Sequence, residues 1–167
     1  NDGAMIETVY MPYEDRSTLC VSSQVGCKMG CKFCASTKAT FVRSLKAEEI
    51  LSEIYVVEKD TNRNINNIVI MGIGEPLDNY DEVIRFIKLA TSVNGKNMSE
   101  RNITLSTCGI VSKIYDLANE GLSINLAISL HATSDEKRKK TMPIANSYTI
   151  NEILKACKFY FEKTGRR

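Results

Sequence analysis

Short apolar runs typical of strands alternate along this chain with longer segments whose apolar residues recur at helical spacing. Residues 8–22 have the pattern of two short strands with a polar turn, and helix-like and strand-like segments then follow in turn. This order predicts an α/β fold built from right-handed βαβ units, either an open doubly wound sheet or part of a (β/α) barrel. We expect strands at residues 68–71, 101–107 and 124–130, and helices at residues 45–59, 79–91, 110–120 and 149–165.

Two of the expected helices begin with a capping residue and a glutamate three positions later. Asn79 precedes Glu82 and Thr149 precedes Glu152 at this spacing. In a capping box, the first side chain accepts a hydrogen bond from the backbone of the third helical residue, whose own side chain reaches back. We therefore predict a capping box at both helix starts.

Four unusual loops follow the four expected parallel strands. A cysteine-rich loop follows the first strand, "GIGEP" the second, "STCG" the third and "SLHAT" the fourth. In open and closed parallel sheets alike, binding and catalytic groups collect at the carboxyl ends of the strands. The sequence therefore predicts one functional rim formed by these four loops.

The loop "GCKMGCKFC" places Cys27, Cys31 and Cys34 within eight residues and supplies no fourth cysteine nearby. Thiolates are soft ligands that suit zinc, copper(I) and iron–sulfur clusters. Structural zinc takes four ligands, and the single histidine of the chain, His131, is far along the sequence. A [4Fe–4S] cluster held by three cysteines keeps one iron open for another ligand. The loop is rich in Gly, Lys and Ser, which argues against three core thiols.

Composition narrows the class of protein without deciding its partner. The 22 Lys and Arg residues against 20 Asp and Glu give a formal net charge of +2, which neither requires nor excludes nucleic acid. We interpret the basic run "KRKK" at residues 137–140 as a solvated helix face in preference to an RNA-facing rim. With no signal peptide and no membrane-length apolar run, we expect a cytoplasmic location and no membrane contact. Six cysteines in such a chain favour metal or redox chemistry over a disulfide framework.

The C-x₃-C-x₂-C spacing, with the aromatic Phe33 before the third cysteine, resembles the radical S-adenosylmethionine (SAM) enzymes. The resemblance implies a partial (β/α) radical SAM barrel with parallel strands. It also implies a [4Fe–4S] cluster whose open iron chelates the amino and carboxylate groups of SAM. An electron from the cluster then splits SAM into methionine and a 5′-deoxyadenosyl radical.

The surrounding residues are more specific. "TLCVSSQVGCKMGCKFCAS", "MGIGEPLDN", "LSTCGIV" and "SLHATSDEKRKKTMPI" together resemble the RlmN family of RNA adenine-C2 methyltransferases, across nearly the whole chain. The resemblance implies that the "GEP" loop holds the SAM amino group, for which a carboxylate is the natural acceptor. The SAM-contacting residues it implies are Gly74, Glu75, Ser106, Ser129, Leu130 and His131.

The same resemblance assigns catalytic roles to Glu7 and Cys20. One SAM would methylate a carrier cysteine, and the radical formed from a second SAM would take a hydrogen atom from that methyl group. The resulting methylene radical would add to C2 of adenine, an electron-poor carbon that cannot attack a sulfonium methyl group itself. Glu7 would remove the C2 proton, and the Cys20 thiolate would release the methylated RNA by forming a disulfide with the carrier.

Parts of the family pattern lie outside this sequence. The carrier cysteine, a further SAM-binding asparagine and an N-terminal accessory domain have no counterpart here, and we assign neither Cys108 nor Cys157 a role. We therefore expect residues 1–167 to be the N-terminal portion of the catalytic domain, truncated at its C-terminus. The implied partners are 23S rRNA, tRNA and a flavodoxin- or ferredoxin-type electron donor.

Three alternatives remain open. A related Cfr-type enzyme would methylate C8 of adenosine. Another radical SAM chemistry, such as thiolation or peptide modification, is disfavoured by the matched spacings of Glu7 and Cys20. A non-catalytic metal-binding module would hold zinc on the three cysteines and one further ligand, and metal analysis separates it from the others.

Overall fold

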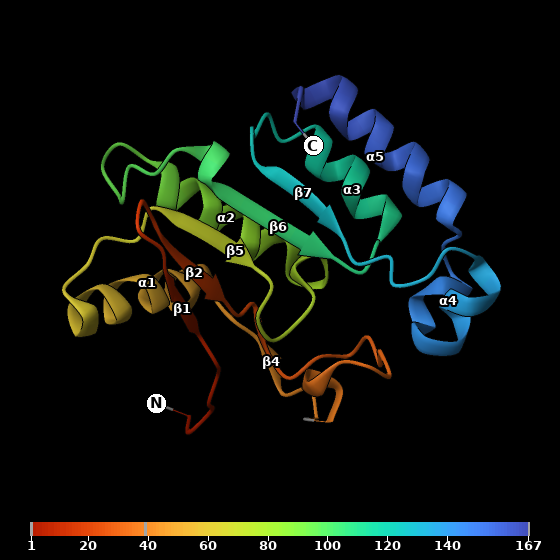
Figure 1. The fold of residues 1–167 in the computed structure, drawn as a ribbon, viewed down its shortest axis with the longest axis horizontal. Coiled ribbons are helices and arrows are strands. Elements are labelled where there is room, and N and C mark those ends of the chain that lie inside the picture. Colours follow the sequence, from red (N-terminus) through yellow and green to blue (C-terminus); the bar gives the residue numbers. More distant parts are fainter. Residues whose placement is uncertain (1, 39, 167) are drawn as a thin grey trace.

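A five-stranded sheet in the order β1-β2-β5-β6-β7 forms the centre of the protein (Figure 1). The computed structural model describes residues 2–38 and 40–166. Strand β1 pairs antiparallel with β2, and every other neighbouring pair of the sheet is parallel. The expected α/β class with parallel strands is therefore confirmed. The strands are β1 (Val9–Pro12), β2 (Ser17–Val21), β5 (Asn67–Ile70), β6 (Ile103–Thr107) and β7 (Asn125–Ile128).

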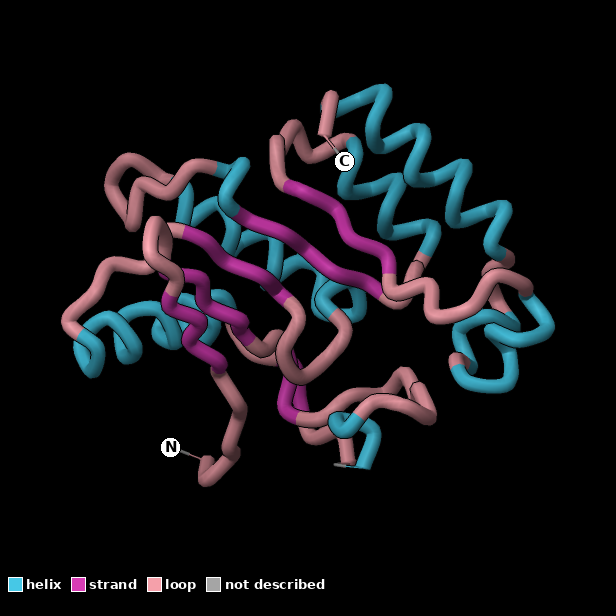
Figure 2. The backbone as a smooth tube through the Cα atoms, viewed as in Figure 1, coloured by secondary structure: helices cyan, strands magenta, loops and turns pink. Residues whose placement is uncertain are grey.

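Five α-helices accompany the sheet, and no described helix crosses its near face in Figures 1 and 2. Helices α1 and α2 lie behind the sheet, while α3 and α5 pack on each other beyond β7. None of the helices in the described ranges is long and apolar enough to span a membrane. The helices are α1 (Ala47–Thr61), α2 (Tyr80–Thr91), α3 (Val111–Ala118), α4 (Asp135–Thr141) and α5 (Ile150–Thr164).

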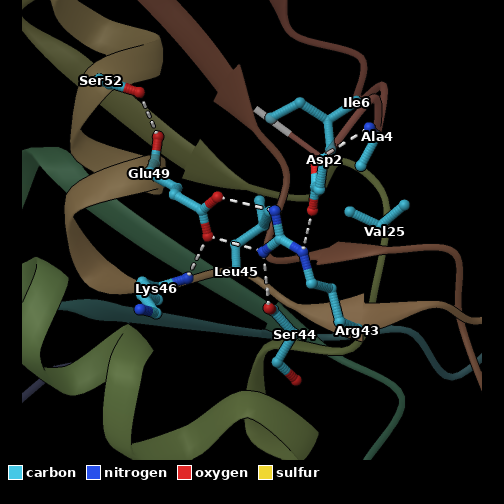
Figure 3. Close-up of a pocket in the computed structure, with 10 residues that line it drawn as sticks. All are labelled: Asp2, Ala4, Ile6, Val25, Arg43, Ser44, Leu45, Lys46, Glu49 and Ser52. Carbon is cyan, nitrogen blue, oxygen red and sulfur yellow. Dashed lines mark hydrogen bonds and ion pairs between the residues drawn. The ribbon is translucent and has the colours of Figure 1, made fainter.

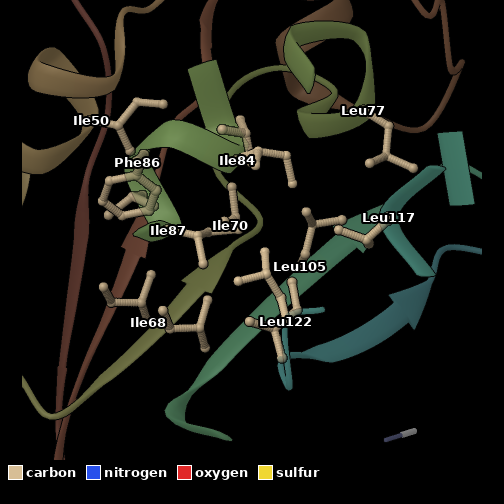
Figure 4. Close-up of a cluster of buried hydrophobic side chains, with 14 of the residues drawn as sticks. Ile50, Ile68, Ile70, Leu77, Ile84, Phe86, Ile87, Leu105, Leu117 and Leu122 are labelled. Carbon is tan, nitrogen blue, oxygen red and sulfur yellow. The ribbon is translucent and has the colours of Figure 1, made fainter. Parts of the chain in front are cut away.

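The two faces of the sheet differ in burial because successive strand residues point to opposite sides. On the covered face, side chains of β5 and β6 such as Ile68, Ile70 and Leu105 are buried against α1 and α2 (Figure 4). On the other face, Cys20 and Ser106 are only partly buried. Two residues expected to take part in chemistry, Cys20 and Ser106, therefore lie on the side of the sheet that no described helix covers.

The two predicted capping boxes have different outcomes. At α5, Thr149 Oγ1 accepts from the Glu152 amide at 3.2 Å and Glu152 Oε2 accepts from the Thr149 amide at 2.8 Å, which confirms the prediction. At α2 the prediction is wrong. The Asn79 side chain donates to the carbonyls of Ser23 and Leu45 instead, at 2.9 and 2.8 Å. A buried amide that ties two other segments together is not free to cap its own helix.

Several short elements were not expected from the sequence. They are the two-stranded ribbon of β3 (Gln24–Val25) and β4 (Arg43–Ser44), helix α4, and the 3₁₀ turns η1 (Ala35–Lys38), η2 (Pro76–Asn79), η3 (Glu100–Asn102) and η4 (Pro143–Asn146). Helix α4 carries the basic run at residues 137–140, where Lys137, Lys139 and Lys140 are exposed. Arg138, however, is completely buried. The interpretation of this run as a solvated face is therefore wrong for Arg138.

Candidate functional site

The four expected loops meet at the carboxyl ends of β2, β5, β6 and β7, as predicted. In Figure 1 the strand arrowheads point towards the side where the cysteine loop and α4 lie. Side chains and backbone join the loops in pairs. Lys28 of the cysteine loop forms an ion pair with Asp78 after "GIGEP", at 3.1 Å, and Phe33 stacks on His131.

The cysteine loop, residues 26–42, is closed at its base by the β3–β4 ribbon. Val25 pairs with Arg43, and the Val42 amide donates to the Val25 carbonyl at 2.8 Å. Gly26 enters the loop with φ of +77°, and a Cβ there would lie 2.4 Å from the Thr40 carbonyl oxygen. Only glycine fits this turn. The two ends of the loop are therefore held together by the ribbon, and its first residue cannot be replaced without steric conflict.

Cys27, Cys31 and Cys34 are free thiols on this loop, Cys31 buried and the others half-buried. Burial raises the pKa of the Cys27 and Cys31 thiols, and their neighbouring thiols and Glu75 raise these pKa values further. Across the described ranges, no three Cys, His, Asp or Glu side chains converge closely enough to hold a single metal ion. Each cysteine of a [4Fe–4S] site binds a different iron, so such a site does not require convergence on one point.

The cysteine loop packs on the segment that contains α4 and η4. The Lys32 amide donates to the carbonyl of Thr141, the last residue of α4, at 2.8 Å. Cys31 shares a small buried cluster with Cys108 and Met142. The loops after β2, β6 and β7 therefore form one packed unit around Cys31.

Glu75 lies beneath the rim, and its carboxylate is almost fully buried. Its Oε1 accepts from the Leu77 amide at 3.0 Å and its Oε2 from the Cys108 amide at 2.8 Å. Burial raises the pKa of this carboxyl, while these hydrogen bonds act to lower it. The structure thus places Glu75 between the "GEP" loop and the end of β6, where it joins the second and third loops.

Gly74 precedes Glu75 with φ of +108°, and a Cβ there would lie 2.6 Å from Cβ of Gln24. The structural reason for this glycine is close contact with the segment after β2. The Gln24 side chain also accepts from the Glu75 amide at 3.0 Å. The fold therefore explains the glycine by itself, and a contact with SAM at Gly74 remains a prediction.

The "SLH" residues lie at the end of β7. Ser129 Oγ is 3.4 Å from Ser106 Oγ of β6, so two residues predicted to contact SAM are neighbours. His131 has φ of +54°, and the Ala132 amide donates to the Leu130 carbonyl across it at 2.8 Å. Such three-residue turns are strained and frequently occur at functional sites. The His131 ring lies 3.9 Å, centroid to centroid, from the Phe33 ring.

Glu7 and Cys20 lie near each other, Cys20 on β2 and Glu7 just before β1. Cys20 pairs with Val9 of β1, and the Glu7 backbone carbonyl accepts from Ser22 Oγ at 2.7 Å. Burial raises the pKa of the Cys20 thiol, and the negative charges of Glu53 and Glu7 raise it further. The structure therefore brings together the two residues that the resemblance treats as catalytic.

Glu53 of α1 is a buried carboxylate that we did not identify from the sequence. Thr8 Oγ1 donates to its Oε2, which also accepts from the Ser22 amide at 3.1 Å. Oε1 has no hydrogen-bond partner among the described residues. Because Glu53 anchors the neighbours of Glu7 and of Cys20, it supports the position of both. Its place beside Ile50 and Ile54 on the apolar face of α1 was the signal available in the sequence.

Burial raises the pKa of Glu53 to about 7. The folded protein then binds more protons than the unfolded chain between the ordinary glutamate pKa and about 7, so stability falls as pH rises through this range. We expect Glu53→Gln to remove this slope and to raise the free energy of unfolding at pH 8 by about 3 kcal/mol. Urea titrations of both proteins from pH 5 to pH 8 measure the difference. Parallel pH profiles would contradict the prediction.

A cavity of about 600 Å³ is lined by the N-terminal segment, the β3–β4 ribbon and the start of α1 (Figure 3). The guanidinium of Arg43 crosses it, bonded to Asp2 and Glu49 at 2.7 Å each. Glu49 also accepts from the Lys46 amide at 2.8 Å. The polar groups of this cavity therefore satisfy one another, and none of the predicted site residues lines it.

Residues 21–166 match the family model of the Radical SAM superfamily. The chain is 59% identical, over all 167 residues, to a protein of Finegoldia magna named probable dual-specificity RNA methyltransferase RlmN. A protein of the same name from Clostridium acetobutylicum is 58% identical over 167 residues. In each case the match covers 48% of the relative, so the chain spans about half the length of these curated relatives.

Two solved structures share the fold. The crystal structure of a radical SAM methyltransferase from Sphaerobacter thermophilus superposes with a TM-score of 0.94 at 42% identity, over 99% of this chain and 50% of that chain. Streptococcus suis SuiB, crystallised with S-adenosylmethionine, has a TM-score of 0.60 at 18% identity, over 89% of this chain and 32% of that one. The second likeness concerns the fold alone.

Proposed function

This chain belongs to the radical SAM superfamily, and we propose that it forms part of an RlmN-type RNA methyltransferase acting on C2 of adenosine in 23S rRNA and tRNA. Membership of the superfamily implies a [4Fe–4S] cluster and SAM as cofactors. The observation that carries the proposal is the 59% identity with an RlmN protein across all 167 residues. Because the chain spans about half of that relative, the carrier cysteine and the accessory domain would lie outside these residues.

Cys27, Cys31 and Cys34 would hold the cluster. The donor set fits, because three soft thiols share one closed loop, and the positive charge of the buried Arg138 guanidinium favours the thiolate form of Cys31. Coordination by a metal deprotonates a thiol outright, whatever burial does to its free pKa. When bound, the cluster supplies the electron that cleaves SAM to methionine and a 5′-deoxyadenosyl radical.

The SAM site would lie where the loops meet. The 3.4 Å separation of the Ser106 and Ser129 hydroxyls and the stacking of His131 on Phe33 support this position. Glu75 is a buried carboxyl group under the same rim, and a carboxylate is the natural acceptor for an ammonium group. The proposed contacts are Gly74, Glu75, Ser106, Ser129, Leu130 and His131.

Glu7 and Cys20 would act on the RNA adduct. Glu7 would accept the C2 proton as the ring regains aromaticity, and the one electron that the adduct loses would return to the cluster, which SAM cleavage leaves oxidised. The Cys20 thiolate then attacks the carrier sulfur. A disulfide forms, the sulfur–methylene bond breaks with its electron pair on carbon, and that carbon takes up a proton to become the methyl group. A thiol-class reductant restores both cysteines. The Glu7 charge lies near enough to act on the Cys20 thiol, and this proximity supports their joint action.

The remaining partners follow from this chemistry. An RNA base can enter the site only when it is unstacked, which suits loops and single-stranded segments. A flavodoxin- or ferredoxin-type protein would supply the electrons. Both partners favour a cytoplasmic location.

Product analysis tests the proposed function. The full-length protein, reconstituted anaerobically with iron and sulfide, is given SAM, reductant and rRNA or tRNA transcripts, and digested nucleosides are analysed by mass spectrometry. We expect 2-methyladenosine, formed with 5′-deoxyadenosine. 8-Methyladenosine would favour the Cfr-type alternative. Zinc in place of iron, with no SAM cleavage, would favour the metal-binding module.

A further inference from the structure

Arg138 is a buried cation with no carboxylate partner. Its side chain is 0% exposed, its guanidinium donates to the carbonyls of Cys108 and Tyr148, and its Nε has no partner among the described residues. No ion pair in the described ranges includes it. Removing a charge from water costs several kcal/mol unless an opposite charge compensates it. The structure therefore needs an anion near Arg138.

The groups that face Arg138 identify where that anion would be. Cys31 and Cys108 interact with its charge from the cysteine loop and from the end of β6. Asp135, one turn earlier on α4, is the carboxylate that acts on it from a distance, but among the described residues it forms no ion pair with Arg138, and its Oδ1 accepts from the Ile150 amide at 2.7 Å. Neutral thiols cannot compensate a cation. An iron–sulfur cluster with three thiolates can, because it carries net negative charge that increases on reduction.

We infer that Arg138 is a positioning residue that acts on the cluster through its charge. The buried positive charge of Arg138 would stabilise the reduced state of the cluster and raise its reduction potential. This role depends on the cluster and holds whichever RNA or adenine carbon is methylated. The short helix α4 provides the placement, because its last carbonyl, that of Thr141, accepts from the Lys32 amide in the cysteine loop. The segment that carries the cation is thus bonded to the loop that carries the ligands.

The test compares Arg138→Met with Lys139→Met in the reconstituted full chain without SAM. Lys139 is the exposed neighbour on α4, so both changes remove one positive charge from the same helix. We expect Arg138→Met to shift the reduction equilibrium about tenfold towards the oxidised cluster. In an EPR-monitored redox titration this corresponds to a midpoint potential lower by about 59 mV. Lys139→Met should shift it less than about twofold because water screens an exposed charge.

Arg138→Lys separates charge from hydrogen bonding and also serves if Arg138→Met does not fold. It keeps the positive charge and loses the planar donor set. We therefore expect the wild-type iron content and a reduction equilibrium within about threefold of that of the wild type. A tenfold shift in Arg138→Lys would overturn the inference in favour of a hydrogen-bonding role. An iron-loaded Arg138→Met with the midpoint of Lys139→Met would also overturn it. Absence of iron from the wild-type protein would instead reject the cluster itself, without involving RNA.

Discussion

Replacing Cys31 with alanine is expected to remove nearly all iron from the reconstituted protein, from about four atoms per chain to less than about one tenth of that content. Cys31 is the most buried of the three loop cysteines, so a water molecule or a small ligand from solvent cannot readily take the place of its sulfur. Cleavage of SAM should disappear with the iron, because the cluster supplies the electron. Iron and sulfide analysis, with EPR of the reduced protein, measures the loss.

Cys108→Ala is the matched control. Cys108 belongs to the same small cluster as Cys31 and Met142 and is equally buried, with 6% and 7% of the two residues exposed. Both changes remove a thiol from the same buried cluster, and Cys108→Ala also removes a side-chain hydrogen bond to Glu75, so Cys108→Ala should lose at least as much stability in urea. Only Cys31→Ala should lose iron. Equal iron in both variants, or a greater loss from Cys108→Ala, would reject the assignment of the three-cysteine loop as the cluster site.

The order of elements and the shared rim could be predicted from the sequence because both depend on local patterns. Alternating strand and helix periods give parallel connections, and parallel connections place every strand–helix loop at one end of the sheet. The contact of Phe33 with His131, 98 positions apart, is a consequence of that topology. The element order and the shared rim could therefore be predicted without knowing the loop conformations or the side-chain packing.

The missed residues depend on contacts between distant segments. Asn79 has the spacing of a capping residue, but its amide bonds to carbonyls near β3 and β4. Arg138 sits in a run of four basic residues, but its guanidinium is buried against the carbonyls of Cys108 after β6 and Tyr148 before α5. Glu53 did have a local signal, since it shares the apolar face of α1 with Ile50 and Ile54. A charge inside an apolar stripe marks a buried group worth separate attention.

Glu7→Gln is expected to lower RNA methylation by a factor of about 10² to 10⁴, the usual contribution of a general base, while SAM is still cleaved. The amide keeps the size of the side chain but cannot accept the C2 proton. Glu14→Gln, an exposed change in the β1–β2 turn, is the matched control and should leave both activities unchanged. The measurement pairs 5′-deoxyadenosine with methyladenosine in the same reaction. Loss of both products together would show that Glu7 supports the SAM site and not proton removal.

Cys20→Ala should stop the reaction one step later, because the carrier sulfur then has no thiolate to attack it. We expect a covalent protein–RNA species on a denaturing gel and at least a hundredfold less free methylated RNA, a loss of the size found when a catalytic group is removed. The adduct accumulates because its carbon–sulfur bond is stable until Cys20 opens it.

Cys157→Ala is the matched control. Cys157 lies on α5, is packed against the main core and is an equally half-buried thiol, so this variant should release product normally. Normal release from Cys20→Ala would exclude the disulfide step. If adducts accumulated in both variants, product release would require thiols in general. The specific role of Cys20 beside Glu7 would then be rejected.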